Sequence, residues 1–185
     1  MRVISGIYKG RTLQTVPDLS VRPATDRVKQ TLFDMLANRI DFEEATILDL
    51  FAGSGGLGIE ALSRGAAHTT FVEDDSKAAS FIEANVQKLG CEANTIIAET
   101  DALSFISRCK DAFDVVFADP PYLFPETKEL PTLIFRSNIV KRHGYLIIEH
   151  TTDLKFESTD LFRAGPEKKF GRTIVTFFRH QSQDI

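Results

Sequence analysis

The residues Asp119, Pro120, Pro121 and Tyr122 combine groups that can act on an exocyclic amine of a nucleobase. Such an amine is a poor nucleophile because its lone pair is delocalised into the ring, and two hydrogen-bond acceptors facing its hydrogens draw the nitrogen toward a tetrahedral geometry. The Asp119 carboxylate supplies one acceptor, and the Pro120 carbonyl, held rigid by Pro121, supplies the other. Tyr122 offers an aromatic face to an unstacked base. Standing alone, the motif is also typical of a turn with a capping aromatic.

The run LDLFAGSGGLGIEAL, from Leu48, predicts a ligand site at a turn between a strand and a helix. Gly53, Gly55 and Gly58 satisfy the pattern G-x-G-x-x-G, and Glu73 follows Gly53 by 20 residues. That spacing is expected of a carboxylate that holds ribose hydroxyls. A tight turn without a ligand is the alternative for any isolated glycine motif.

Asp49, just before the glycine turn, discriminates between two cofactors. A nicotinamide dinucleotide places its pyrophosphate at the helix N-terminus, where a carboxylate would repel it. S-adenosylmethionine instead carries a sulfonium and an ammonium group, which favour nearby carboxylates. The sequence therefore favours the methyl donor, with Asp101 accepting a hydrogen bond from the adenine amino group. Three further residues are expected to line this site: Phe51, Ser54 and Ala102.

The elements that must position these residues alternate along the chain. Apolar runs predict strands near residues 46–51, 69–73, 94–98, 113–118 and 145–149, and helices near 56–64, 76–89, 102–109 and 126–142, the last interrupted by Pro131. Apolar strands that alternate with helices indicate an α/β, Rossmann-like fold, with a mostly parallel sheet covered by helices on both faces. Ligands bind at the carboxyl ends of such strands, near the switch in strand order. These ends carry Asp49, Glu73, Asp101 and Asp119.

Both ends of the chain are expected to add to this core. RVISGIYKGRTLQTV predicts a small hairpin around Gly6 and Gly10, followed by a helix capped by Thr25 or Asp26. That helix carries an apolar stripe of Val28, Leu32, Met35 and Leu36. LFRAGPEKKFGRTIVTFFRH predicts a hairpin added antiparallel to one edge of the sheet.

Composition indicates one soluble globular domain with an uneven charge distribution. The chain has 185 residues, 43% of them hydrophobic, and a net charge of -4. Residues 1–40 hold seven Lys or Arg against three Asp or Glu, residues 163–180 hold five against one, and residues 41–162 hold 10 against 21. Basic ends fit an enzyme that binds a polyanion, and they equally fit solvated faces.

The two cysteines indicate no metal site, and the apolar runs indicate neither secretion nor insertion into a membrane. Cys91 and Cys109 are far from any second Cys or His cluster, so we expect reduced thiols and no metal site. The sequence contains neither a signal peptide nor an apolar run long enough to span a membrane. We therefore expect a cytoplasmic protein.

Six blocks spanning nearly the whole chain carry a family resemblance: RVISGIYKGRTL, RPATDRVKQTLFDML, LDLFAGSGGLGIEALSRGA, FVEDD, ADPPY and FGRTIVTFF. Together they resemble the bacterial 16S rRNA guanine-N2 methyltransferase family, a group of class I S-adenosylmethionine-dependent methyltransferases. The glycine and DPPY blocks alone specify only amino-methyltransferases, and the N-terminal blocks narrow the resemblance. It implies a seven-stranded sheet and methyl transfer to N2 of one guanine in 16S rRNA, in the small ribosomal subunit or an assembly intermediate.

The resemblance also implies roles for residues near both ends. Arg22, Thr25 and Arg27 match a block near the mouth of the cofactor pocket, although Ala24 stands where that block usually has Thr. Thr25 is then left to supply the hydroxyl contact. Residues 1–40 would form an RNA-binding extension, residues 41–185 the methyltransferase core, and the protein would be a monomer. Three basic residues would contact RNA phosphates: Lys168, Lys169 and Arg172.

Three other hypotheses remain open. DPPY chemistry also serves DNA adenine-N6 and cytosine-N4 methyltransferases, although the short chain has no evident large DNA-recognition domain. A noncatalytic RNA-binding or ribosome-assembly factor would retain the pocket, and intact Asp49, Glu73 and Asp119 argue against it. An NAD-dependent oxidoreductase is the most distant alternative.

Overall fold

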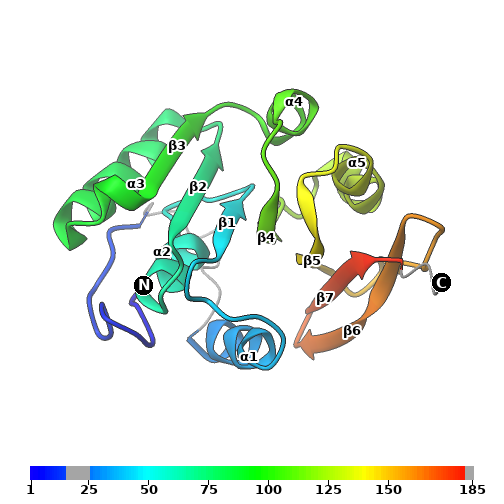
Figure 1. Ribbon diagram of the computed structural model, residues 1–185, viewed down its shortest axis with the longest axis horizontal. Helices are drawn as coiled ribbons and strands as arrows, with labels where there is room; N and C mark the ends of the chain where they lie inside the picture. Colours follow the sequence, from blue (N-terminus) through cyan, green and yellow to red (C-terminus); the bar gives the residue numbers. More distant parts are fainter. Residues whose placement is uncertain (16–25, 182–185) are drawn as a thin grey trace.

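A seven-stranded sheet lies at the centre of the protein in a computed structural model that describes residues 1–15 and 26–181 (Figure 1). Its strand order is β3-β2-β1-β4-β5-β7-β6. The strands are β1 (Thr46–Asp49), β2 (His68–Glu73), β3 (Thr95–Glu99), β4 (Phe113–Ala118), β5 (Val140–Thr151), β6 (Phe162–Phe170) and β7 (Thr173–His180). The helices are α1 (Asp26–Ala37), α2 (Gly56–Ser63), α3 (Ser76–Leu89), α4 (Ala102–Arg108) and α5 (Leu130–Arg136), with short 3₁₀ helices η1 (Glu92–Asn94) and η2 (Pro125–Lys128).

The pairing of the strands confirms the predicted topology. β1 to β5 pair in parallel, and the hairpin of β6 and β7 joins the edge of β5 antiparallel. The chain runs outward from β1 to β2 and β3, and then returns to place β4 on the other side of β1. The switch in strand order therefore lies between β1 and β4, where the glycine turn and the DPPY stretch both begin.

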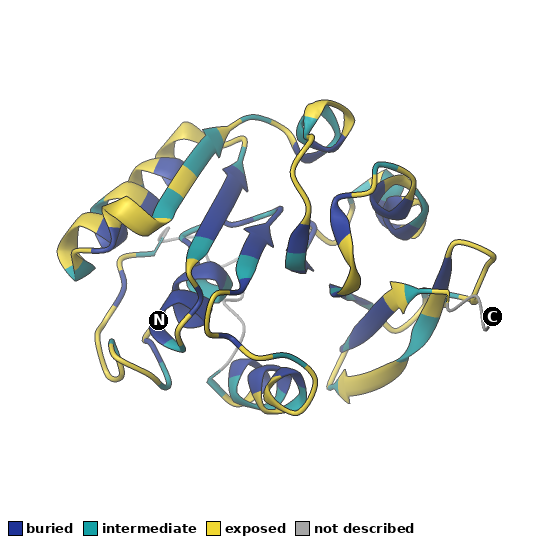
Figure 2. Cartoon of the chain, viewed as in Figure 1, coloured by how far each residue is buried: buried dark blue, intermediate teal, exposed yellow. Residues whose placement is uncertain are grey.

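Both faces of the sheet are covered, which explains why its central strands are almost entirely apolar. One face carries Phe117 and Val175 and packs against α1 and α2. The opposite face carries Val116 and Leu146 and packs against α4 and α5 (Figure 1). The central strands are accordingly buried between the two layers of helices (Figure 2). Burying one such side chain stabilises the fold by about 1.5–3 kcal/mol.

The segment 126–142 is less helical than its sequence predicts. It holds the end of η2, then the seven-residue α5, and β5 begins at Val140. Asn138 ends the helical region because its backbone is left-handed, with φ of 57°. Gly144 allows a bulge in β5, since a Cβ there would lie 2.8 Å from the Asp114 carbonyl oxygen.

The predicted N-terminal hairpin is reduced to one antiparallel bridge, between Arg2 and Thr12. Glu60 of α2, which is fully buried, holds this segment in place. Its two carboxylate oxygens accept hydrogen bonds from the backbone nitrogens of Ile4, at 2.7 Å, and Ser5, at 3.0 Å. The segment is therefore attached to the helix that follows the glycine turn.

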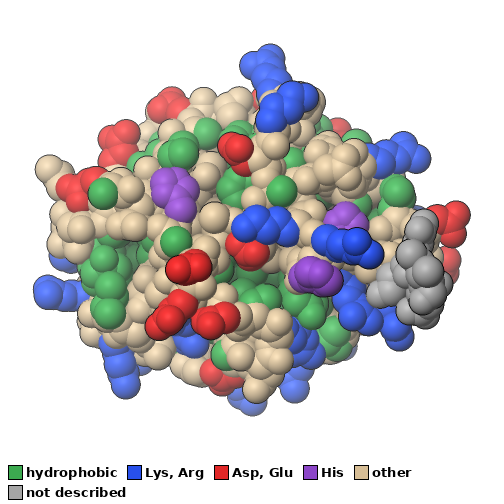
Figure 3. Space-filling view, in the orientation of Figure 1, with side chains coloured by type: hydrophobic (Ala, Val, Ile, Leu, Met, Phe, Trp, Pro, Cys, Tyr) green, Lys and Arg blue, Asp and Glu red, His purple; other side chains and the backbone are tan. Residues whose placement is uncertain are grey.

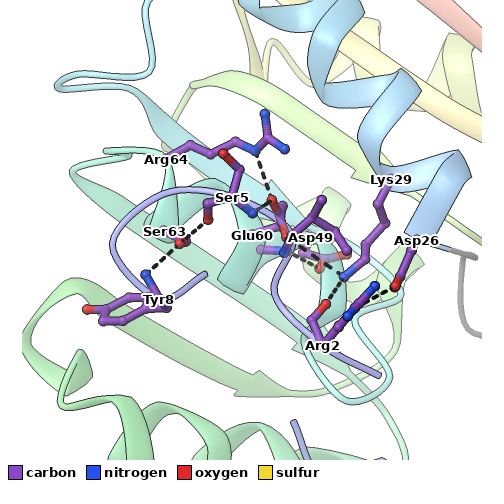
Figure 4. Close-up of polar contacts among 11 residues, drawn as sticks. Arg2, Ser5, Tyr8, Asp26, Lys29, Asp49, Glu60, Ser63 and Arg64 are labelled. Atoms are coloured by element: carbon purple, nitrogen blue, oxygen red, sulfur yellow. Dashed lines mark hydrogen bonds and ion pairs between the residues drawn. The ribbon is translucent and has the colours of Figure 1, made fainter. Parts of the chain in front are cut away.

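Glu60 also links α1 to α2 through charge (Figure 4). The Lys29 ammonium lies 3.8 Å from one Glu60 oxygen, and Arg64 Nε donates to the other at 2.9 Å. Lys29 also donates to the Arg2 carbonyl at 2.6 Å. Burial lowers the pKa of Lys29, and the nearby Glu60 carboxylate opposes that shift. These contacts join the N-terminal segment, α1 and α2 into one unit.

The expected boundary at residue 40 does not coincide with a gap in the core. α1 packs directly on the sheet through the predicted stripe, with Val28, Leu32 and Leu36 buried. The role of residues 1–40 in RNA binding stays a prediction. Within residues 1–15 and 26–181, no helix is long and apolar enough to cross a membrane.

Replacing Glu60 with Ala should lower the free energy of unfolding by about 3–5 kcal/mol, because it removes the negative partner of the buried Lys29 and leaves two backbone N–H groups without their acceptor. Urea denaturation at pH 7 measures the change. Glu83→Ala, at an exposed position on α3, is the matched control and should change stability by less than about 0.5 kcal/mol. Equal losses in the two variants would contradict the assigned role of Glu60.

Candidate active site

The glycine turn after β1 adopts a conformation that depends on its glycines. Gly53 and Gly55 have φ of 55° and 83°, in the left-handed region that other residues avoid. Gly58 serves a different purpose, because a Cβ there would lie 2.3 Å from the Phe71 ring. This glycine lets α2 pack closely on β2. The turn therefore has the backbone geometry that the G-x-G-x-x-G pattern predicts.

Asp49, the last residue of β1, has a buried carboxyl group. One of its oxygens accepts a hydrogen bond of 3.0 Å from the Gly58 backbone nitrogen, at the start of α2. Burial raises the pKa of Asp49 to about 7, and the neighbouring Glu73 carboxylate adds to the shift while the Gly58 hydrogen bond opposes it. None of the described Lys, Arg and His residues forms an ion pair with Asp49. The site thus offers a buried carboxyl group that a cation would stabilise in its ionised form.

Glu73 ends β2 and holds the glycine turn from the other side. Its oxygens accept hydrogen bonds from the backbone nitrogens of Gly53, at 2.7 Å, and Asp75, at 3.0 Å. Burial raises the pKa of Glu73, and these two hydrogen bonds oppose the shift. Asp75 in turn caps α3 by accepting from the Lys77 backbone nitrogen. Glu73 therefore lies beside the turn, as its spacing predicts.

The other residues expected at the cofactor site lie along the same edge. Asp101 is exposed and caps α4 by accepting from the Ser104 backbone nitrogen at 2.8 Å. Ala102 is the buried first residue of that helix. The Ser54 carbonyl accepts a hydrogen bond of 3.1 Å from the buried Asn85 side chain. Asn85 was missed from the sequence, where an Asn inside an amphipathic helix carries no distinctive signal.

The DPPY stretch forms a tight turn that projects from the carboxyl end of β4. The Phe124 nitrogen donates to the Pro121 carbonyl at 2.8 Å, and the Phe124 ring packs on Phe51 at 5.1 Å between centroids. This anchoring leaves Tyr122, at 59% exposed, and Leu123, at 93%, on the tip of the turn. Tyr122 is thus accessible to an incoming ring, and its role in stacking a base stays a prediction.

A cavity opens beside this turn and contains a carboxyl group that sequence reasoning missed. Asp119 and the two prolines line one side of it, and Glu149 of β5 lines the other. Burial raises the pKa of Asp119 well above its ordinary value, and repulsion from Glu149 and then Asp49 adds to the shift. The signal was present, because Glu149 ends the apolar run YLIIE just as Asp49 and Asp119 end theirs.

The basic residues expected to contact RNA fall into three groups. Arg22 lies outside the described residues, as does Thr25 of the expected cofactor site, and Arg27 is exposed on α1. The β6–β7 hairpin carries exposed basic side chains, and Lys and Arg gather on that side of the view in Figure 3. Lys168 and Lys169 point to opposite faces because side chains alternate along a strand. Lys168 pairs with Val175, which also pairs with Glu149, so Lys168 shares the Glu149 face.

Comparisons with known proteins agree with this arrangement. The family model described as "Conserved hypothetical protein 95" matches residues 1–179. The Escherichia coli K12 protein named ribosomal RNA small subunit methyltransferase D is 40% identical over 99% of this chain and 91% of its own. The protein of the same name from Haemophilus influenzae is 35% identical over 98% and 94%. The solved structure of Escherichia coli yhhF superposes with a TM-score of 0.86, at 31% identity and 99% coverage of both chains.

A Rossmann-like sheet whose β1 leads through a carboxylate into a glycine turn, with DPPY at the end of the neighbouring β4, defines a class I S-adenosylmethionine-dependent methyltransferase. The matched residues span nearly the whole chain. The chain belongs to the family of the ribosomal RNA small subunit methyltransferase D proteins.

The buried Asp49 carboxyl group should make the free protein less stable as the pH rises. Its folded pKa of about 7 exceeds the ordinary value of 3.8, so the folded state binds more protons between these values and stability falls across that window. At about 1.4 kcal/mol per unit of pKa, the loss is of the order of 4 kcal/mol. Asp49→Asn removes this loss and should be more stable than the wild type at pH 8, while the two differ little at pH 4.

Denaturation curves from pH 4 to pH 8 measure this difference. The exposed Asp160→Asn should follow the wild type at every pH and serves as the control. A constant difference between Asp49→Asn and the wild type across this range would show that Asp49 has no raised pKa.

Proposed function

We propose that the protein transfers a methyl group from S-adenosylmethionine to the exocyclic N2 amine of a guanine in 16S rRNA, within the small ribosomal subunit or an assembly intermediate. The observation that carries this proposal is the position of Asp119 and the Pro120 carbonyl at the end of β4, next to the strand that leads into the glycine turn. The names of the relatives support the choice of small-subunit rRNA. A ribosomal substrate would be met in the cytoplasm.

The residues of the glycine-turn site fit the methyl donor. S-adenosylmethionine, when bound, supplies an electrophilic methyl group on a positively charged sulfur. Asp49 would face positive charge, which fits its burial and its lack of an ion-pair partner among the described residues. Glu73 would exchange part of its contact with the turn for ribose hydroxyls, and Asp101 would accept from the adenine amino group. Three residues complete the proposed donor site: Phe51, Ser54 and Thr25.

The DPPY turn would hold the target base. Asp119 and the Pro120 carbonyl accept hydrogen bonds from the two amine hydrogens and so direct the nitrogen lone pair toward the methyl group. Tyr122 stacks on a base drawn out of the RNA, and Pro121 keeps the Pro120 carbonyl fixed. Asp119 then takes the proton that the nitrogen loses.

Basic residues would hold the RNA backbone around this site. Arg22 and Arg27 would lie on the N-terminal side, and the β6–β7 hairpin would supply further phosphate contacts. Lys168 lies on the sheet face that Glu149 also occupies, so we expect it to contribute more than Lys169. Arg172, exposed at the hairpin turn, completes the set.

Asp119→Asn should separate donor binding from methyl transfer. Without an anionic acceptor for the amine proton, the single-turnover rate on 30S subunits should fall by about 100-fold or more. The dissociation constant for S-adenosylmethionine, measured by calorimetry, should change by less than about three-fold, because Asp119 lies outside the glycine turn. A wild-type rate in this variant would refute the proposal.

Asp111→Asn is the matched control for that experiment. It removes an exposed carboxylate just before β4, at the opposite end of the strand from Asp119. Both its rate and its donor affinity should equal those of the wild type.

Lys168→Ala should weaken binding to 16S rRNA and reduce the slope of log K against log salt by about one unit, as expected for the loss of one phosphate contact. Filter binding at several salt concentrations measures the slope. Lys77→Ala, at an exposed position on α3, removes the same charge beside β3, the edge strand opposite β6, and should leave the slope unchanged. Equal slopes for Lys168→Ala and the wild type would exclude this contact.

A further inference from the structure

Glu149 and Asp119 lie side by side near the carboxyl ends of neighbouring strands: Asp119 directly follows β4, and Glu149 lies two residues before the end of β5. Ala118 of β4 pairs with Ile148 of β5, so the next residue on each strand, Asp119 and Glu149, falls on the opposite face from that pair. Both side chains line the cavity beside the DPPY turn. Both also border an apolar cavity beneath it, together with Val28 of α1. The site proposed for the target amine therefore contains two carboxyl groups.

The two cavities contain little positive charge that could stabilise both carboxyl groups in their ionised form. Among the described residues, the titratable side chains that line the two cavities are Asp119, Tyr122, Glu149 and His150, and no Lys or Arg lines either cavity. Lys168 of β6 lies on the same sheet face as Glu149, two strands away, and these two described residues form no ion pair. The rest of the lower cavity is apolar and comes from α1, α2 and the sheet. Asp49 on β1 adds a third negative group near Asp119. Two adjacent carboxylates in such a site cannot both ionise easily.

The pKa values of both groups change in the direction that this geometry predicts. Burial raises the pKa of Glu149, and a hydrogen bond with the Thr173 side chain opposes the shift. For Asp119, burial comes first and repulsion from Glu149 comes second. The pair consequently retains a proton at a pH where ordinary carboxyl groups have lost theirs.

We propose that Glu149 is a positioning residue that acts through Asp119: the two carboxyl groups share one proton, and Glu149 holds it while the target amine donates its hydrogen bond to Asp119. This inference rests on the proposed function of the site. The shared proton leaves Asp119 ionised as an acceptor for the amine, without placing two negative charges in the cavity. Removing the Glu149 carboxyl group should therefore change how Asp119 titrates.

The proton balance of the reaction follows from this arrangement. As the bond between the amine nitrogen and the methyl carbon forms, the bond between sulfur and that carbon breaks and its electron pair stays on sulfur. Asp119 accepts the proton that the nitrogen loses, so the pair now holds two protons. Glu149, which is partly exposed, releases one of them to water and restores the shared-proton state.

Glu149→Gln tests this inference in two independent measurements. In the free protein with ¹³C-labelled aspartate carboxyls, the NMR signal of Asp119, identified by its loss in Asp119→Asn, should titrate about one pH unit or more lower in Glu149→Gln than in the wild type. The single-turnover rate on 30S subunits, measured against pH, should show an acid limb that moves to lower pH together with the Asp119 midpoint. Its plateau should fall by about three-fold or more, because Asp119 becomes a weaker base.

Two further variants sharpen the result. Glu149→Asp keeps a carboxyl group and should titrate closer to the wild type than Glu149→Gln does. Glu157→Gln removes an exposed carboxylate with the same change in net charge, and it should leave the Asp119 midpoint and the rate profile unaltered. An unchanged Asp119 midpoint in Glu149→Gln, or an unchanged acid limb, would overturn the inference. Failure of the wild type to methylate guanine would instead contradict the proposed function, and the NMR midpoint would still decide whether the two carboxyl groups are coupled.

Discussion

The free-energy cost of burying carboxyl groups is the constraint on which the rest of this structure depends. Four adjacent strands, β2, β1, β4 and β5, carry a row of carboxyl groups at or near their carboxyl ends. Glu73 and Asp49 are the last residues of β2 and β1, Asp119 directly follows β4, and Glu149 lies two residues before the end of β5. Burial raises the pKa of every member, and repulsion between neighbours adds to the shift for Asp49 and Asp119. A fold stabilised only by packing would place apolar residues there. The row is therefore best explained by ligands that carry positive charge or donate hydrogen bonds.

The rest of the fold keeps this row in position. Backbone N–H groups hold the two carboxylates nearest the glycine turn, with Gly58 donating to Asp49 and Gly53 donating to Glu73. Behind the turn, Glu60 attaches the N-terminal segment and α1 to α2. An RNA-binding role for the N-terminal residues would thus act on the helix that begins at the cofactor site. The contact between the Phe124 and Phe51 rings likewise keeps the DPPY turn in position.

Sequence patterns predict the sheet well because both of its faces are buried. Apolar runs predict β1 to β4 closely, and they also predict that Asp49, Glu73 and Asp119 lie at the carboxyl ends of their strands. The prediction of helix in 126–142 was wrong beyond Arg136, because a left-handed Asn138 and a bulge at Gly144 depend on tertiary contacts rather than on periodicity. Lys168 and Lys169 are adjacent in the sequence and were predicted to act together, but the strand directs their side chains to opposite faces of the sheet.

Other features required knowledge of which strands are neighbours. Glu149 gains its importance only from the pairing of β4 with β5, which brings it beside Asp119. The hydrogen bonds that Asn85 donates to the carbonyls of Gln14 and Ser54 depend likewise on how α3 packs. Local sequence indicates which residues can do chemistry, and the topology decides which of them act together.

Identification of the methylated nucleoside tests the central claim most directly. Isolated 30S subunits, naked 16S rRNA and DNA would each be incubated with the protein and S-adenosylmethionine labelled in its methyl group, and the digested nucleosides analysed by mass spectrometry. The account predicts label in N2-methylguanosine from 16S rRNA, at one mapped position. Label in N6-methyladenine or N4-methylcytosine, or no transfer to any of the three substrates, would contradict it.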